Sequence, residues 1–356
     1  MQRIHFFRTL GLLLVLQPCS FYGRAQLISK EQGREIVAKL PKEKAPDKHY
    51  IGSYTKELTT RVFGSRKYTT YRLHDKGYEN RVIYRPNSPF NVGVGMNYRH
   101  IGLNLGFNLP VINQTSTYGK TRFLDLQTHI YGRKMLIDFY GQFYKGYYID
   151  NSKVLLDNKQ VYIRPDLRTF NIGTVVQYLV NGDRFSFKAA YLQNEVQLKS
   201  AGSLILGGSV SVVQISADSS VVPGNLTYTD FFNNYHFNRT GMQSITANIG
   251  YAYTVVLPYH FFVTGSLLGG IGANHSRLRN TDLDEYAEKL GSEFNATIRV
   301  ALGYNSRRYF AGIHYVSTMA SSSAPIAGAR QEFGSGNFRV SVATRWPLKK
   351  KLLGFY

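Results

Sequence analysis

The sequence predicts an all-β protein: a transmembrane, antiparallel, up-and-down β-barrel of about fourteen strands, preceded by a short periplasmic segment. Three observations predict this fold class. Stretches of about nine residues alternate between apolar and polar side chains, as strands with two different faces do. The chain begins with a segment typical of exported proteins. It also carries 27 Tyr and 22 Phe but one Trp, and barrels place such aromatic residues at the two membrane interfaces.

The first 25 residues predict a secretory signal peptide. A basic start with Arg3 and Arg8 precedes the apolar run Leu10–Leu16, and a small-x-small cleavage site ends at Ala25. The run is too short for a membrane-spanning helix. A buried core helix and a lipoprotein signal ending at Cys19 are the alternatives. Because Cys19 is the only cysteine, the exported chain would have no disulfide, Cys-based metal site or thiol nucleophile.

The charge balance limits the classes of partner that we expect for this protein. The chain has 43 Lys and Arg against 22 Asp and Glu, a formal net charge of +21. Cleavage removes three Arg and no acid, which leaves +18. An exported barrel meets little nucleic acid, and no basic-aromatic recognition motif is present, so we expect no nucleic-acid partner. We expect contacts with outer-membrane lipid and glycolipid, and anionic solutes in the lumen.

The mature chain divides into three parts. Residues 26–57 are polar and rich in Lys and predict a periplasmic lead segment. Residues 58–346 carry the alternating stretches and predict the outer-membrane barrel. Residues 347–356 predict a basic C-terminal periplasmic tail. The expected location is therefore the outer membrane of the cell.

The hairpin at 90–98 and 101–109 has the clearest strand pattern. Val92, Val94 and Met96 fall on one face of its first strand, whereas Gly93 and Gly95 fall on the other. A polar face of Gly and Asn suits a crowded lumen better than bulk water. Further strands are expected at 68–73, 123–131, 135–147, 170–180, 185–193, 203–213, 245–256, 261–274, 294–304, 309–318 and 338–346.

The lengths of the connections predict the topology. Short links fall at 99–100, 132–133, 181–183, 258–259 and 305–306, and long ones near 110–121, 148–167, 278–292 and 320–332. Outer-membrane barrels keep short turns on the periplasmic side. Keeping all short links on one side requires the strand at 68–73 and another at 225–235, which gives fourteen; without these two the number is twelve. The alternating last strand, closed by Trp346, is typical of the signal read by the barrel-insertion machinery.

Four segments of the sequence resemble a known bacterial family. They are Asn87–Gly95, Tyr144–Tyr148, Lys199–Ser203 and Gly250–Thr254. The family is called domain of unknown function 4421, and the resemblance spans roughly residues 50 to 346. It implies an outer-membrane barrel of a Gram-negative envelope. It implies no activity, cofactor or catalytic residue.

One group of lumen-facing side chains has the residue types of a catalytic base with its orienting group. Asp125 and His129 share the inward register of one strand, and Asp138 lies on the hairpin partner. Such a set could serve a lipid hydrolase or acyltransferase if a nucleophile lay within hydrogen-bond reach. No nucleophile motif accompanies it. A lumen network that neutralises its own charges is the alternative, so we predict no catalytic residue and expect that the protein is not an enzyme.

Four cations share the inward register: Lys188, Arg299, Arg339 and Arg345. They could line a path for anions, as rings of charge do in pores. They could equally pair with Asp125, Asp138 and loop carboxylates. No His cluster has metal-ligand spacing, so no metal or other cofactor is expected.

The sequence therefore favours an outer-membrane barrel that acts as a narrow channel with a basic lumen, or as a structural protein of the envelope. One alternative is a cell-surface interaction protein that uses the loops at 148–167, 215–242 and 320–332. A second is a lipid-modifying enzyme that uses His129. A third is a soluble secreted sandwich rather than a barrel.

Overall fold

The computed structural model describes residues 45–75, 80–88, 90–98, 101–108, 115–150, 155, 161–228 and 230–348. The expected signal peptide, most of the lead segment, the link at 99–100 and most of the tail lie outside the described residues. The elements are β1 (Ile51–Ser53), β2 (Leu58–Asp75), β3 (Asn80–Arg85), β4 (Phe90–Tyr98), β5 (Ile101–Asn108), α3 (Thr115–Tyr118), β6 (Arg122–Tyr131), β7 (Met135–Ile149), β8 (Ile163–Leu179), η4 (Lys188–Leu192), β9 (Glu195–Gln197), β10 (Ala201–Ser216), η5 (Phe231–Asn234), β11 (Phe237–Val256), η6 (Pro258–His260), β12 (Phe261–Asn280), β13 (Tyr286–Asn305), β14 (Tyr309–Ser323) and β15 (Arg330–Trp346).

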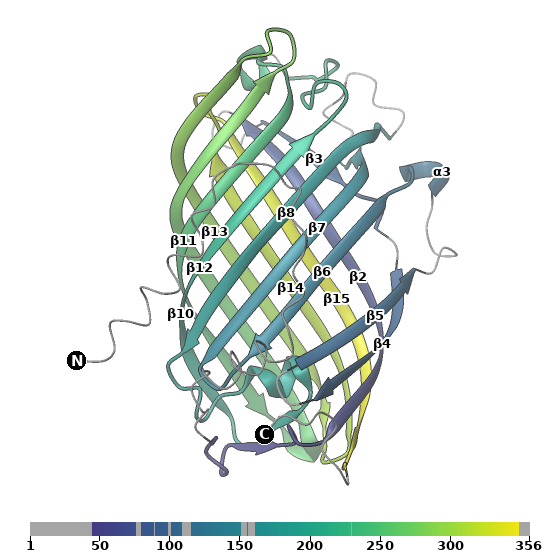
Figure 1. The fold of residues 1–356 in the computed structure, drawn as a ribbon, viewed down its shortest axis with the longest axis vertical. Helices are drawn as coiled ribbons and strands as arrows, with labels where there is room; N and C mark the ends of the chain where they lie inside the picture. The colour runs from purple at the N-terminus through teal and green to yellow at the C-terminus, as the bar shows by residue number, and fades with distance from the viewer. Residues whose placement is uncertain are drawn as a thin grey trace, which may run out of the picture. The chain divides into compact units, whose positions relative to one another are not determined.

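Thirteen strands form one antiparallel sheet that closes on itself (Figure 1). The last strand, β15, pairs with the first long strand, β2, from Trp346 opposite Leu58 to Arg330 opposite His74. From β15 the order runs through β14, β13, β12, β11, β10, β8 and β7 to β3, which pairs with β2. The two pairs between β3 and β7 complete a ring of ten strands. The predicted fold class, an antiparallel up-and-down barrel, is confirmed.

Strands β4, β5 and β6 lie outside the ring of ten. β3 and β4 are two parts of one return along β2, because β3 pairs with its second half and β4 with its first half. β4 pairs with β5, and β6 pairs with β7. Among the described residues, no hydrogen-bonded pairing joins β5 to β6. Counting β3 and β4 as one, the thirteen strands make twelve passes along the barrel.

Two expected strands are not strands. Residues 185–193 contain the π-helix η4, and residues 225–235 contain the 3₁₀-helix η5. Without them the number falls from fourteen to twelve. The prediction of long loops at 278–292 and 320–332 is also wrong. β12 and β13 extend to a turn at 281–285, and β14 and β15 extend to a turn at 324–329. The short turns at 132–134, 257–260 and 306–308 lie at the end where Leu58 meets Trp346.

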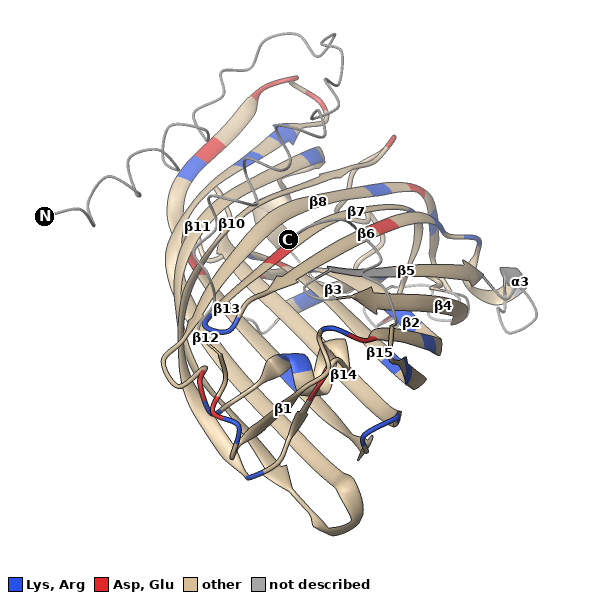
Figure 2. Ribbon diagram, turned by 60° about the horizontal axis from the view of Figure 1, so that its bottom comes forward, with Lys and Arg blue, Asp and Glu red and all other residues tan. Residues whose placement is uncertain are grey.

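The outward face of the barrel is apolar, as period-two alternation requires. Ile245, Ile249 and Leu267 are about 60% exposed, whereas their immediate neighbours along the strands, such as Thr246 and Leu268, are buried on the inward face. Figure 2 shows Lys, Arg, Asp and Glu mainly toward the strand ends and turns, while the middle stretches of β11, β12 and β13 carry little charge. None of the helices in the described part of the chain is long and apolar enough to cross a membrane.

The segment at 185–197 folds into the barrel near the end with the short turns. Inward side chains of several wall strands hold its backbone: His314 Nε2 lies 2.9 Å from the Ala190 carbonyl oxygen, and Asn305 Nδ2 donates to the carbonyls of Ala189 and Glu195. Its Phe185 and Phe187 pack in a buried apolar cluster with wall residues from β6, β7, β8, β10, β11 and β12. We call residues 185–197 the plug.

The segment at 217–236 closes the opposite end. Phe232 and Val221 are fully buried in the largest apolar cluster, which includes wall residues from β2, β3, β7, β11 and β15. The Phe232 backbone N–H donates to Asp75 Oδ2 over 3.1 Å, and the Tyr84 hydroxyl donates to the Val221 carbonyl. We call residues 217–236 the cap.

Candidate functional site: a polar chamber in the lumen

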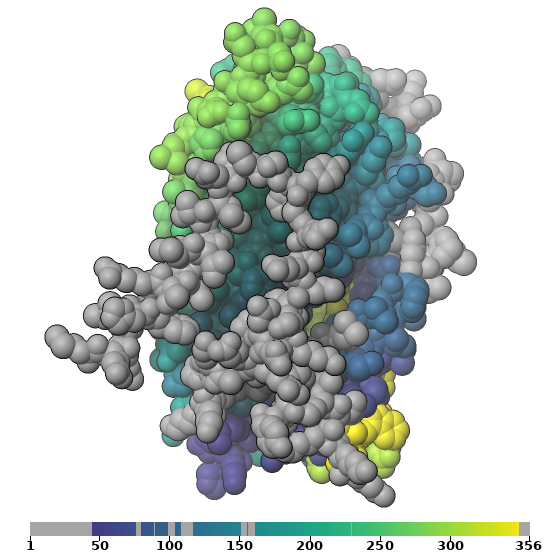
Figure 3. Space-filling model, viewed as in Figure 1, coloured from purple at the N-terminus to yellow at the C-terminus, as the bar shows by residue number. Residues whose placement is uncertain are grey.

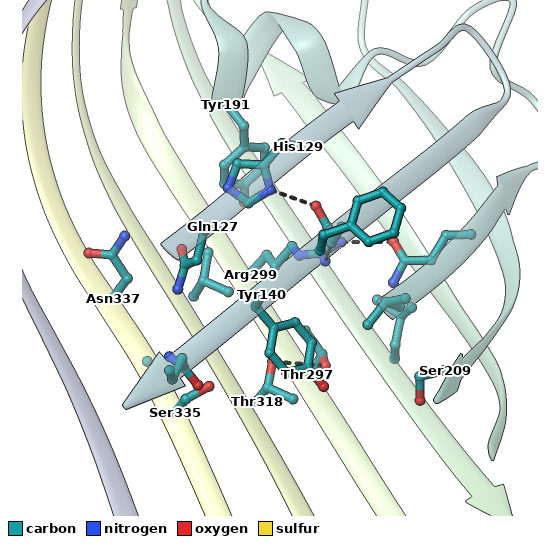
Figure 4. A pocket seen from close by; sticks show the side chains of 18 of the residues that line it. Gln127, His129, Tyr140, Tyr191, Ser209, Thr297, Arg299, Thr318, Ser335 and Asn337 are labelled. Carbon is teal, nitrogen blue, oxygen red and sulfur yellow. Dashed lines mark hydrogen bonds and ion pairs between the residues drawn. The ribbon is translucent and has the colours of Figure 1, made fainter. Parts of the chain in front are cut away.

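A chamber of about 200 Å³ lies in the lumen. Strands from all around the barrel line it, and the plug contributes Tyr191 and Leu192. Figure 4 shows the labelled polar side chains, among them Gln127, Thr297 and Thr318, projecting from facing strands into the same space. A chamber of this size with polar walls suits a small polar ligand or several waters.

The structure brings two of the three expected catalytic candidates together. His129 Nδ1 lies 2.6 Å from Asp138 Oδ1, as β6 and β7 place these residues directly opposite. Asp138 Oδ2 accepts a hydrogen bond from Arg299 over 2.9 Å, and Arg299 also donates to Gln177 Oε1 over 2.9 Å. Figure 4 shows His129 and Arg299 within this group. The carboxylate is thus shared between the Arg299 guanidinium and the His129 imidazole, and the pair with Arg299 suits charge neutralisation in a lumen.

Asp125 does not join this group, contrary to the sequence-based expectation. It lies four residues before His129 on β6 and accepts hydrogen bonds from Lys67 over 2.9 Å, Gln142 over 3.0 Å and Tyr144 over 3.0 Å. Within the described part of the chain, His129 makes no hydrogen bond to a Ser, Thr or Cys side chain. A base and its orienting group are therefore present without an aligned nucleophile.

Two of the four expected lumen cations belong to the packing of the plug. Lys188 lies on η4 rather than on a wall strand and is buried 4.0 Å from Glu195 Oε1. Glu195 is also paired with Arg133 at 2.5 Å. Arg345 is fully buried and donates to the Gln193 carbonyl over 2.9 Å and to Asn305 Oδ1 over 2.6 Å. These two cations fasten the plug and do not line the chamber.

The other two cations line the chamber, but only one is neutralised. Arg299 is paired with Asp138. Arg339 has no carboxylate partner among the described residues, and its Nε is buried without a hydrogen bond. Its guanidinium carbon lies 4.8 Å from the centre of the Phe63 ring, a cation–π contact.

A second unpaired arginine was missed by the sequence analysis. Arg61 on β2 is 3% exposed and lines the chamber, and none of its three guanidinium nitrogens has a hydrogen-bond partner among the described residues. The expected first strand began only at 68, because consecutive polar residues Thr59 and Thr60 obscure the alternation before it. Phe63 lies two residues after Arg61 and therefore on the same face of the strand. This apolar residue is the signal in the sequence that could have placed Arg61 on an inward face.

The plug contributes a hydroxyl group to the same chamber. Tyr191 lines the chamber with its oxygen buried and unpaired, and its ring packs 5.7 Å from that of His314. Burial raises the pKa of Tyr191 well above its usual value, so the phenol stays protonated and can donate a hydrogen bond. Among the described residues, no group of three or more His, Cys, Asp or Glu side chains is arranged to hold a metal ion.

Fold and chamber together define the class: an up-and-down β-barrel with a plugged, polar lumen. Residues 45–342 match the family described as domain of unknown function DUF4421. The chain belongs to that family, which the sequence resemblance had indicated. No curated protein matches the chain.

Solved structures with some likeness to this chain include outer-membrane proteins. The outer membrane protease OmpT from Escherichia coli is 8% identical, with 83% of this chain and 98% of that chain covered and a TM-score of 0.38. The anion-selective porin from Comamonas acidovorans is 8% identical, with 82% and 100% covered and a TM-score of 0.16. The Pseudomonas putida toluene transporter TodX is 8% identical, with 81% and 89% covered and a TM-score of 0.18. At these values none of them bears on what this chain does.

Proposed function

We propose that this protein spans the outer membrane as a plugged β-barrel whose lumen admits small anions. The single observation that carries the proposal is the pair of unneutralised arginines, Arg61 and Arg339, at the wall of a polar chamber. An arginine stays charged in proteins, and a buried charge without a partner is costly. A lumen that retains two such groups is suited to anions, as charged rings are in selective pores.

The height of the apolar belt supports a membrane location. On β13 the outward residues from Phe294 to Tyr304 are apolar, and their immediate outward neighbours on β12 include Leu267 and Ile271. At ~3.3 Å per residue and a tilt near 40°, eleven residues cover roughly 25 Å, which is the height of the apolar band in outer-membrane barrels. Above this belt β12 and β13 carry outward charges such as Arg277 and Glu288, suited to lipid headgroups and glycolipid.

Conductance tests the anion role. We expect mature protein refolded into planar bilayers to give small currents with a reversal potential that reports anion preference in a KCl gradient. The double variant Arg61→Gln/Arg339→Gln should lose that preference, whereas the control Arg277→Gln, on the outer surface, should keep it. Absence of current, or preference for cations, would overturn the anion role.

An outer-membrane lipid-modifying enzyme is the second candidate, and the 2.6 Å contact between His129 and Asp138 is the observation in its favour. A nucleophile aligned with His129 is needed to complete it. Unchanged lipid profiles in a His129→Ala strain would remove this candidate. A cell-surface interaction protein is a further alternative; the buried Phe231 and Phe232 make the cap a poor recognition loop.

A further inference from the structure

Arg61 and Arg339 have the features of a ligand site rather than of a structural ion pair. Both lie on adjacent strands, β2 and β15, and both line the chamber. In the described part of the chain no Asp or Glu forms an ion pair with either side chain. Removing one partner from a buried ion pair is strongly destabilising, so two cations without acids at one cavity imply that a ligand supplies the negative charge.

The neighbouring packing holds both guanidinium groups at the chamber wall. Gly95 on β4 leaves space that Arg61 occupies: a Cβ at residue 95 would come to 3.0 Å from Arg61 Cγ and Nε and would collide with Asn104 Oδ1. Gly93 likewise leaves space for the Phe63 ring, which makes the cation–π contact with Arg339. The glycine face of this hairpin therefore shapes the site. Pre-organised donors of this kind recognise phosphate and carboxylate groups well.

Neutral groups that line the same chamber indicate what else the ligand carries. The hydroxyl of Tyr191 is a hydrogen-bond donor that has no partner within the part of the chain that the structure describes. The amide oxygens of Asn97, Asn104 and Asn337 are acceptors without partners, and all three residues line the chamber. Since Asn97 Nδ2 donates to the Leu192 carbonyl, its oxygen remains available. A ligand that satisfies this set has an anionic group and hydroxyl groups of its own.

The wall beside the site is interrupted. The described residues show no ladder between β5 and β6, and the chamber is lined by Asn104 on one side of this seam and by Gln127 and His129 on the other. In Figure 3 yellow atoms of the C-terminal part of the chain are visible between the blue and teal parts of the wall. The outward side chains next to the seam, Leu105 and Leu126, are apolar and exposed.

We propose that Arg61 and Arg339 bind the phosphate or carboxylate group of a hydroxyl-bearing molecule, which enters through the seam between β5 and β6. An apolar rim on a polar chamber suits an amphiphile whose headgroup enters the lumen while its acyl chain stays outside. The site deepens the proposed anion role and rests on it for the ligand's charge. It does not require conduction, so binding can be measured independently of current.

Binding to the purified mature protein in a non-ionic detergent tests the site. The probes are inorganic phosphate, glycerol 3-phosphate and a short-chain phosphatidylglycerol, followed by isothermal titration. We expect saturable binding that Arg61→Gln/Arg339→Gln weakens at least tenfold, while Arg277→Gln leaves it unchanged. Tighter binding of the lipid than of glycerol 3-phosphate supports entry through the seam, and equal or weaker binding of the lipid overturns that entrance. Absence of binding, or equal binding by the double variant, overturns the site.

A stability measurement separates a binding role from a structural one. If Arg61 binds a ligand, Arg61→Met should raise the urea concentration at the midpoint of unfolding of the ligand-free protein, because the substitution removes an uncompensated buried charge. Added glycerol 3-phosphate should raise the midpoint of the unmodified protein but not that of the variant. A lower midpoint for Arg61→Met without ligand would show that the arginine supports the fold instead, and would overturn the proposal.

Discussion

At the scale of single residues, inward-facing glycines determine how the side chains pack in the lumen. The inward glycines of β4 allow the long side chains of β2 to lie flat against the wall. The outward glycines have a different environment: Gly265 and Gly269 on β12 would meet no atom within 4 Å if they carried a Cβ. The same residue type thus has a packing role on one face and none on the other.

This contrast gives a prediction with a matched control. Gly95→Ala should lower the free energy of unfolding by roughly 1–3 kcal/mol, the usual cost of overpacking, because the new Cβ meets Asn104 and Arg61. Gly269→Ala should change it little. Urea unfolding in lipid vesicles measures both, and equal effects of the two substitutions would contradict the packing described for β4.

At the scale of elements, the plug is held by a buried charge cluster. Glu195 is fully buried and accepts hydrogen bonds from both terminal nitrogens of Arg133 and from Ser186 Oγ, with Lys188 4.0 Å away. One carboxylate thereby faces two buried cations. Such a group is far more sensitive to substitution than an exposed ion pair.

Glu195→Gln should therefore loosen the plug. Loss of the carboxylate leaves the two cations without their common anion, at a cost of roughly 3–5 kcal/mol. We expect faster hydrogen exchange over residues 185–197 and larger currents in planar bilayers. The control Glu288→Gln removes half of an exposed pair with Arg277 and should change neither measurement. Unchanged exchange in Glu195→Gln would show that apolar packing alone holds the plug.

The plug also shows where sequence reasoning stops. Phe185 and Phe187 alternate with Ser186 and Lys188, so the start of residues 185–193 looks like a wall strand. The alternation carries no information there, because the barrel surrounds the plug and buries both of its faces. Alternation of apolar and polar residues indicates a wall strand only where the two faces of the segment lie in different environments.

At the scale of the whole molecule, the antiparallel barrel could be predicted from alternation, and the short turns at 132–134, 257–260 and 306–308 could be placed at one end from the connection lengths. His129 and Asp138 could be placed together because they share the inward register of one hairpin. The proposed ligand site could not be predicted, since Arg61 and Arg339 are 278 positions apart in the sequence. Only closure of β15 onto β2 makes them neighbours.

In a membrane-spanning barrel, alternate residues of the strands face lipid and lumen. Since Cys19 is the only cysteine and belongs to the predicted signal peptide, single cysteines can be introduced into the mature chain at Phe294, Asn295, Thr297 and Ile298 on β13. A fluorophore at residues 294 and 298 should be quenched by a lipid-borne quencher, and one at residues 295 and 297 should not. Equal quenching at all four positions, or none at any, would contradict a membrane-spanning barrel.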